Sequence, residues 1–342
     1  MEENQNEEKK DPAPNFSDGA KKDYFTPISI LLAAVILSVS MFYNSGRSLT
    51  KIPTTPPTNQ SLFSDLEKGL PPTAGVTLPV KWGDLGVMMT SVGIIDKQKM
   101  ETLYAGRGCL NSEDKKMLED TENGNIKISS RNAGFLLNMF WALGLGNKNE
   151  ILDNGPMMTY DGQIPVSRAQ ALAKASNFAS TGGWTLATGN AMDHFSRHPL
   201  INLTPEQQKL VEQVSKNIYR PCCNNPTHFP DCNHGIAMLG LLELMASQGV
   251  SEQDMYKTAL QVNSYWFPDT YLTIAAFMKN KGVAWQDVKA QEMLGANFSS
   301  ASGYARVASQ VTQPEKQNGN GGCGVDNGEP KAPPRQQGGC GL

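Results

Sequence analysis

The apolar residues of this chain recur mainly at helical spacing, every three or four positions, from about residue 82 to residue 311. Serine, threonine or aspartate stands ahead of many of these segments, and glycine follows several of them, as expected at helix starts and ends. We find no convincing run of alternating apolar and polar residues. The pattern therefore predicts a mainly α fold, an irregular helical bundle, with residues 61–80 and 111–128 largely in loops. Helices are expected to begin after Asp84, Asp96, Ser129 or Ser130, Ser167, Thr204, Ser251 and Asp269, and near Ala284.

One of the expected helices is apolar almost all round. The segment from Ile236 to Ala246 contains a single charged residue, Glu243, and such a segment is typical of a helix buried at the centre of a domain. We expect Glu243 to mark the one solvated edge of this helix; the alternative is a buried carboxyl group with a raised pKa. Glu243 follows His234 by nine residues, about 900° of helical rotation, so the two side chains should point to opposite sides.

Near the N-terminus, twenty residues from Tyr24 to Tyr43 carry no charge. A helix of that length spans about 30 Å, the thickness of a bilayer core. Lysines are more frequent before the segment than after it, which favours a cytoplasmic N-terminus. The segment therefore predicts a single-pass signal-anchor in the cell membrane, with the main domain extracytoplasmic. The alternatives are a buried helix of a soluble domain and a cleaved signal peptide.

The remaining composition suggests how the chain is divided. Residues 1–23 are polar and charged and are expected to form a disordered cytoplasmic segment. Residues 44–81 form a Pro/Thr-rich linker, which leads to a helical domain at 82–311. Residues 312–342 are expected to be a disordered Gly/Cys tail, in which the sequence GGCG surrounds Cys323 and again Cys340. These tail thiols could pass a metal ion to a fixed site, or could simply be cross-linked in a solvated tail.

Charge and missing motifs narrow the classes of function. The formal net charge is −3, which gives no reason to expect nucleic-acid binding, and no protein partner is indicated. The chain contains no HExxH, GxSxG, phosphate-binding GxxxxGK[ST] loop, dinucleotide-binding glycine pattern or CxxCH motif. Hydrolase, nucleotide-binding and c-type haem functions are therefore disfavoured, and no enzyme activity follows from the sequence.

Seven of the ten cysteines and histidines lie between His194 and His234. The densest part is the proline-rich loop 221–234, PCCNNPTHFPDCNH, which runs directly into the apolar helix. Asp231 or Asn233 is the expected N-cap of that helix, which would place Cys232 at the positive end of the helix dipole and favour its thiolate. Three sulfurs and one imidazole are a ligand set for zinc, copper or iron. The predicted metal ligands are Cys222, Cys223, Cys232 and His234.

Two other interpretations of these cysteines stay open. Cysteines outside the membrane tend to be oxidised, so a structural disulfide is possible, with Cys232 and Cys109 the best partners because a bridge between adjacent cysteines is strained. The domain would then be a disulfide-braced scaffold or binding domain without catalysis. Alternatively, Cys232 could be the attacking thiolate of a membrane-tethered thiol-disulfide oxidoreductase, with Cys222 or Cys223 as the resolving thiol.

Of the three remaining histidines, two precede the loop and one, His228, lies within it. His194 and His198 have the spacing that places two imidazoles on one face of a helix, and Asp193 could orient one of them. The alternative is two surface histidines in a loop, because Pro199 follows directly. His228 stands between two prolines and is expected to be exposed.

Overall fold

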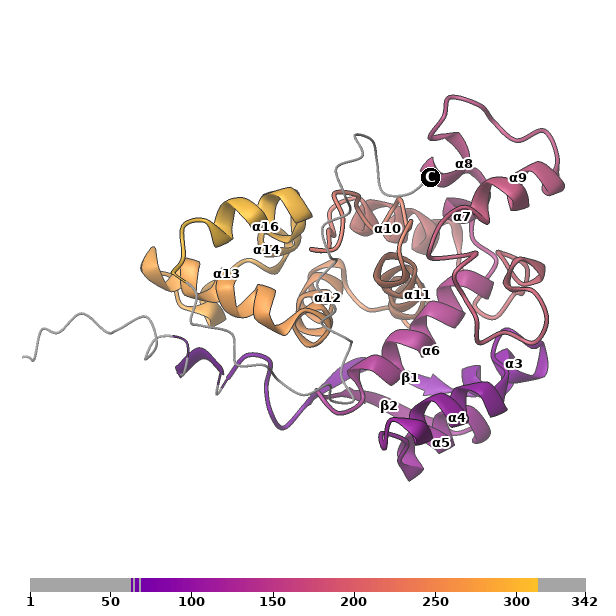
Figure 1. The fold of residues 1–342 in the computed structure, drawn as a ribbon, viewed down its shortest axis with the longest axis horizontal. Coiled ribbons are helices and arrows are strands. Elements are labelled where there is room, and N and C mark those ends of the chain that lie inside the picture. Colours follow the sequence, from indigo (N-terminus) through magenta and orange to yellow (C-terminus); the bar gives the residue numbers. More distant parts are fainter. Residues whose placement is uncertain (1–62, 64, 68, 313–342) are drawn as a thin grey trace, which may run out of the picture. The chain divides into compact units, whose positions relative to one another are not determined.

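The computed structural model describes residues 63, 65–67 and 69–312 (Figure 1), all of which belong to one compact unit, Pro57–Leu342. The predicted membrane segment at 24–43, residues 1–23, most of the linker and nearly all of the tail lie outside these residues. Within the described part, no helix is long and apolar enough to cross a membrane.

The expectation of a mainly α fold is confirmed. The described residues form fourteen α-helices, two short 3-10 helices and one two-stranded sheet. In chain order the elements are β1 (Val76–Gly83), α3 (Leu85–Ser91), α4 (Lys97–Gly106), α5 (Ser112–Glu119), β2 (Asn123–Ile128), α6 (Ala133–Gly146), α7 (Glu150–Asn154), α8 (Pro156–Thr159), α9 (Arg168–Ala175), η1 (Ala191–Asp193), α10 (Pro205–Ser215), α11 (Asn233–Ser247), α12 (Glu252–Trp266), α13 (Pro268–Asn280), η2 (Trp285–Asp287), α14 (Ala290–Leu294), α15 (Ala296–Ser299) and α16 (Ala301–Ala308).

Most of the expected helix starts are found where side-chain caps were predicted. A cap side chain accepts a backbone N–H hydrogen bond three residues on at Asp96, Ser167, Thr204 and Ser251. Asp84 precedes α3 without such a bond. Two expected caps are wrong: Asn132 precedes α6, and α13 begins at Pro268 after Phe267. Proline suits the first position of a helix because its missing N–H would have no partner there.

The small sheet was not predicted. Strands β1 and β2 pair antiparallel, and β1 buries every second residue, Leu78, Val80 and Trp82. Pro79 lies inside β1, where the register between Thr77 and Lys81 is irregular. Proline cannot donate to a strand ladder, so its presence argues against a strand in the sequence and disturbs the pairing in the structure.

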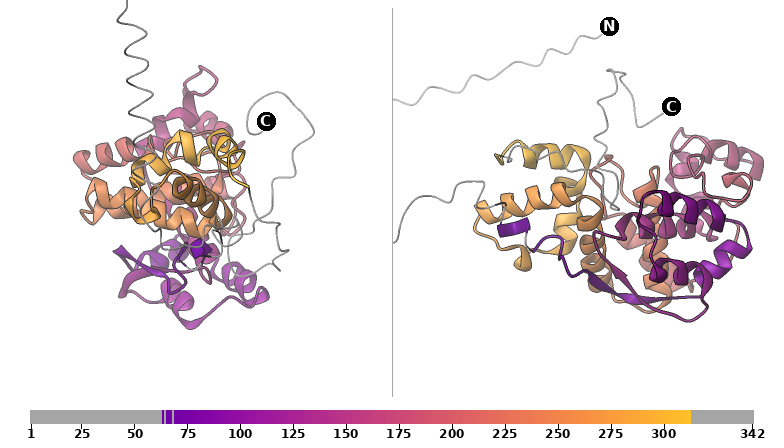
Figure 2. Two further views of the ribbon diagram at one scale, coloured as in Figure 1. Left: turned by 90° about the vertical axis from the view of Figure 1, so that its left-hand side faces the viewer. Right: turned by 60° about the horizontal axis from the view of Figure 1, so that its bottom comes forward.

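Helices α6 and α11 cross at the centre of the domain (Figure 1) and are the most closely packed pair among the described elements. Their backbones meet at two glycines: a Cβ added to Gly240 would lie 2.6 Å from the backbone nitrogen of Gly144. Helices α13 to α16 gather on one side of α12, and α3 to α5 lie with the sheet on the other side of α6 (Figure 2). The crossing fixes α11, which carries Cys232 at its N-cap, inside the core.

Candidate metal centre

The predicted Cys/His loop joins α10 to α11 and is held by backbone hydrogen bonds at both ends. The N–H of Thr227 donates to the oxygen of Ile218 (2.7 Å), and the N–H of His228 donates to that of Ser215 (3.0 Å). On its other side, the oxygen of Cys223 accepts from the N–H of Ala301 at the start of α16 (2.9 Å). The loop is therefore attached to α16 as well as to the two helices that it connects.

The buried guanidinium of Arg220 lies at the centre of the loop, and its role was not predicted from the sequence. Arg220 is only 1% exposed. Its Nε donates to Cys232 Sγ (3.0 Å), and its terminal nitrogens donate to the oxygens of Asn225 (2.9 Å) and Phe229 (3.0 Å) and to Asp231 Oδ1 (2.5 Å). Gly235 makes room for it, because a Cβ there would lie 2.5 Å from Arg220 Cζ. The only sequence signal was one arginine and one aspartate in a loop, which by itself indicates no contact.

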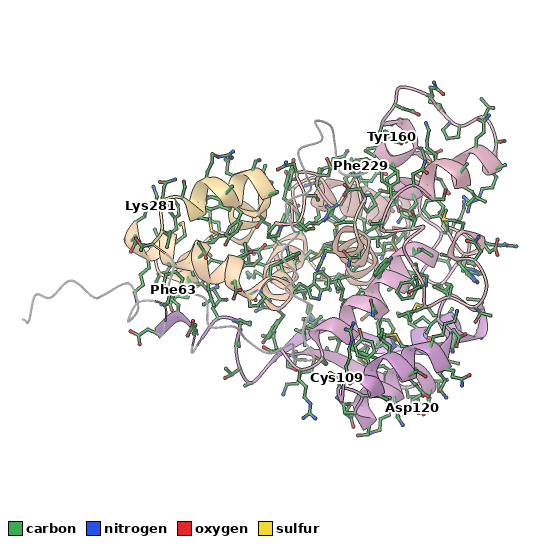
Figure 3. All side chains as sticks on the ribbon, viewed as in Figure 1. Phe63, Cys109, Asp120, Tyr160, Phe229 and Lys281 are labelled. Atoms are coloured by element: carbon green, nitrogen blue, oxygen red, sulfur yellow. The ribbon has the colours of Figure 1, made fainter. Side chains whose placement is uncertain are left out.

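The loop cysteines are free thiols that lie close together. The Sγ atoms of Cys222 and Cys232 are 3.3 Å apart, and no disulfide joins Cys222, Cys223 or Cys232 to any residue. The expected bridge between Cys232 and Cys109 is therefore wrong. Cys109 is buried in the turn after α4 (Figure 3), far along the chain from the loop.

Two overlapping groups of side chains are arranged so that they could hold a metal ion. Cys222, Cys232 and His234 form one group, and Cys223, Asp231 and Cys232 form the other; within each group the donor atoms lie within 4.8 Å of one another. Cys232 belongs to both groups. The structure thus brings together all four predicted ligands and adds Asp231, which sequence analysis had treated only as a helix cap.

The two groups share the contact of Cys232 with Arg220 and differ in whether their other donor atoms already have partners. Asp231 Oδ1 accepts from Arg220, its Oδ2 accepts from Asn225 Nδ2 (2.8 Å), and Cys223 Sγ contacts Asp231 Oδ1 (3.7 Å). In the first group, by contrast, both ring nitrogens of His234 are buried and have no hydrogen-bond partner among the described residues. Buried polar atoms are rarely left without a partner in native proteins. The imidazole of the first group is therefore available to an ion, whereas the carboxylate of the second group is already paired with Arg220.

The electrostatics of the three thiols follow from their mutual hydrogen bonds. Hydrogen bonding from Cys222 and then Cys223, together with the nearby guanidinium of Arg220, holds the pKa of Cys232 well below its ordinary value. Hydrogen bonds with Cys223 and then with Cys232, together with burial, raise the pKa of Cys222. Cys232 itself is the N-cap of α11, so the expected cap at Asp231 or Asn233 is wrong. The surroundings of the centre thus favour ionisation of Cys232 over ionisation of Cys222.

The other histidines do not join this centre. His194 and His198 are not on one helix, because η1 ends at Asp193, yet their rings stack with centroids 5.3 Å apart and His194 Nδ1 lies 3.1 Å from His198 Nε2. His194 is buried, with Nε2 3.1 Å from the oxygen of Thr188, so the expectation of two surface histidines fails for it. His228 is half-buried beside Ser215 Oγ (3.3 Å) rather than exposed.

Glu243 is not at a solvated edge, which corrects the preferred expectation. Its side chain is fully buried between α6 and α11, where Oε2 accepts from Asn147 Nδ2 (2.9 Å) and Oε1 has no partner among the described residues. Burial raises the pKa of Glu243 well above its ordinary value. Glu243 belongs to neither metal-binding group, in agreement with its predicted position on the opposite side of the helix from His234.

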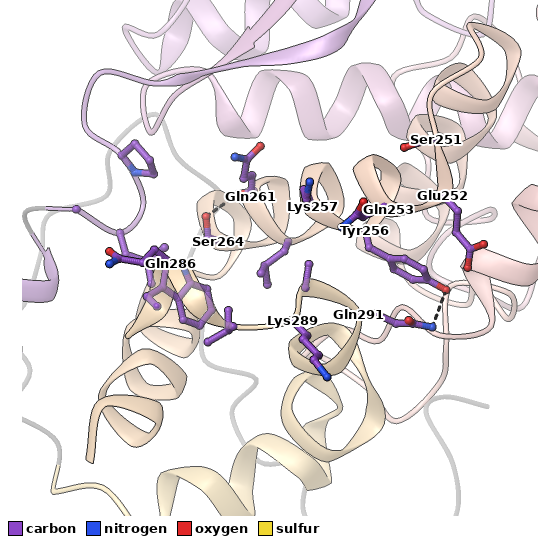
Figure 4. Close-up of a pocket in the computed structure, with 17 residues that line it drawn as sticks. Ser251, Glu252, Gln253, Tyr256, Lys257, Gln261, Ser264, Gln286, Lys289 and Gln291 are labelled. Carbon is purple, nitrogen blue, oxygen red and sulfur yellow. Dashed lines mark hydrogen bonds between the residues drawn. The ribbon is translucent and has the colours of Figure 1, made fainter. Parts of the chain in front are cut away.

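A cleft of about 940 Å³ lies elsewhere in the domain, between α12 and the segment 285–291 (Figure 4). Its polar lining is mostly amide and hydroxyl groups; Gln291 Nε2 donates to Tyr256 Oη across it (3.3 Å). None of the candidate ligands lines this cleft. The cleft and the metal centre are therefore separate features.

Comparison of the chain with known proteins finds no match among family models, curated proteins or solved structures.

Proposed function

We propose that this chain is a membrane-anchored extracytoplasmic protein that binds one thiophilic transition-metal ion between Cys222 Sγ, Cys232 Sγ and a ring nitrogen of His234. The observation that carries the proposal is the buried imidazole of His234, whose ring nitrogens lie within 4.8 Å of two free thiols and have no hydrogen-bond partner at bonding distance among the described residues. Sulfur and imidazole are the donors that zinc, copper and iron prefer in proteins.

Charge balance favours a divalent ion. Two thiolates and a neutral imidazole carry a charge of −2, which balances the +2 charge of a divalent ion. A neutral complex suits a half-buried site because unbalanced charge is costly away from water. The neighbouring Arg220–Asp231 pair is itself neutral. We therefore favour zinc, with iron(II) as the competing divalent ion and copper(I) leaving one negative charge beside Arg220.

Three protein ligands leave a fourth position, and two groups could fill it. Cys223 Sγ lies within 4.8 Å of Cys232 Sγ, but in the structure it contacts Asp231 Oδ1 and the oxygen of Asn225. A metal complex that includes Cys223 requires this sulfur to leave those contacts. The side of the centre at Cys222 is exposed, so water or an exogenous ligand can occupy the position instead.

Elemental analysis of the full chain, purified anaerobically in detergent, tests the proposal. We expect about one equivalent of metal, lost in Cys222→Ser, Cys232→Ser and His234→Phe. Phenylalanine retains a ring against Phe267, whose centroid is 4.4 Å from that of His234. His228→Phe is the matched control and should keep the metal. Metal retained in Cys232→Ser, or absent from the wild-type protein, contradicts the proposal.

The membrane location is supported by the uncharged segment 24–43 alone. Carbonate extraction of cell membranes should leave the full chain in the pellet. Removal of residues 1–43 should release it. A full-length chain found in the cytosolic supernatant would contradict the anchor.

A further inference from the structure

The two sulfurs of Cys222 and Cys232 are nearly close enough to bond to each other. They are 3.3 Å apart, and a disulfide bond is about 2.05 Å long, so the sulfurs need to approach by only about 1.3 Å. Cys232 is fixed at the N-cap of α11, while Cys222 lies in the loop and is exposed. An exposed thiol beside a fixed second thiol is the arrangement that thiol–disulfide exchange requires.

The third thiol is less suited to the same reaction. Cys223 is 3% exposed, and its sulfur points to Asp231 Oδ1 and to the oxygen of Asn225. It is also adjacent to Cys222 in the chain, and a bridge between neighbouring cysteines is strained. The geometry therefore selects one pair among the three free thiols.

We propose that Cys222 and Cys232 form a redox-active dithiol that reduces low-molecular-weight disulfides. The proton of Cys222 passes to the sulfur of Cys232, 3.3 Å away, and Cys222 Sγ attacks one sulfur of the incoming disulfide. The S–S bond breaks, and the first half leaves as a thiolate that takes this proton from Cys232. Cys232 Sγ then attacks Cys222 Sγ in the mixed disulfide, the bond to the second half breaks, and that half leaves as a thiolate. One external disulfide is reduced to two thiols, and the dithiol is oxidised to one disulfide, so atoms and electrons balance.

This activity belongs to the metal-free protein and does not require that the centre binds a metal. If it does bind one, the same two sulfurs serve as ligands, so oxidation and metal binding exclude each other. Metal bound to these sulfurs would then protect the dithiol, and an oxidant would release the metal.

Glutathione disulfide is a suitable probe. The full chain is reduced, freed of metal with a chelator and incubated with the probe; remaining thiols are alkylated, and peptides are mapped by mass spectrometry. We expect a link between Cys222 and Cys232, retained in Cys223→Ser. In Cys232→Ser the mixed disulfide should accumulate on Cys222. In Cys222→Ser the probe should react with Cys232 at least about tenfold more slowly, because access controls the exchange rate.

Absence of the link in both the wild-type protein and Cys223→Ser overturns the proposal, as does an equally fast link between Cys223 and Cys232 in Cys222→Ser. The wild-type map needs no substitution, so a variant that misfolds does not affect it. Metal analysis is separate: a link without bound metal removes the metal function alone, and bound metal without a link removes the dithiol alone.

Discussion

Replacing Glu243 with glutamine should make the protein more stable at neutral pH. The carboxyl group lies in the middle of α11, and among the described residues its hydrogen-bonding neighbours are uncharged amides, with Asn147 Nδ2 2.9 Å from Oε2. Glutamine has the same shape, and its oxygen can keep accepting from Asn147. The substitution therefore removes the cost of the ionisable group while leaving the packing of α6 against α11 intact.

The size of the effect depends on pH in a defined direction. Burial raises the pKa of Glu243 well above 4.5, so the folded protein keeps the proton at pH values where the unfolded chain has lost it. The contribution of Glu243 to the free energy of unfolding is therefore greatest below pH 4.5. It falls by about 1.4 kcal/mol for each pH unit above that value. When the native carboxyl stays protonated from pH 5 to pH 7, the free energy of unfolding of Glu243→Gln rises over that interval by about 2.7 kcal/mol relative to that of the wild type.

Urea unfolding of the full chain in mild detergent, followed by tryptophan fluorescence at several pH values, measures this difference. Glu122→Gln is the matched control, because Glu122 is exposed and its side chain can be replaced without disturbing the core. A constant difference between wild type and Glu243→Gln from pH 5 to pH 7 would refute the reasoning, since it would mean that Glu243 ionises normally in the fold.

Three further substitutions test other parts of the structure by the same unfolding measurement. Gly240→Ala should destabilise the protein by about 1–3 kcal/mol, because the new Cβ meets the backbone of α6; Gly106→Ala, with no atom nearby, should be neutral or slightly stabilising. Arg220→Met should cost about 3–5 kcal/mol by leaving Asp231 buried without its cation; an unchanged midpoint would show that the pair is dispensable. For Asp114→Asn, the free energy of unfolding should rise by about 2–3 kcal/mol relative to that of the wild type as the pH increases from 3.8 to 6, because burial raises the pKa of Asp114 to about 6. Parallel plots of unfolding free energy against pH for the two proteins would contradict this.

Much of the helical framework could be predicted from the sequence because local signals specify it. The hydroxyl of Thr204 with Pro205 beside it starts α10 as expected, and the apolar run from Ile236 to Ala246 lies buried in α11. The sheet was missed because its signal is non-local: Pro79 argues against a strand, and β2 contributes only Ile126 and Ile128 to the core.

The candidate site was predicted in part for a similar reason. Clustering of cysteine and histidine in 221–234 located the loop, but spacing could not show which donors would be left without partners. That depends on Arg220, whose side chain lies across the loop to reach Asp231 and Cys232. The burial of Glu243 likewise depends on Asn147, which lies 96 residues away in the chain, so no local pattern could indicate it.

The buried arginine has a consequence for how the loop behaves when an ion leaves. Many small metal-binding modules collapse when chelated, because the ion is their only internal cross-link. Here the guanidinium of Arg220 ties four points of the loop together, and no chelator can extract it. We therefore expect the apo form to keep its backbone, so that loading and unloading can proceed as simple ligand exchange at the exposed thiol, without any refolding.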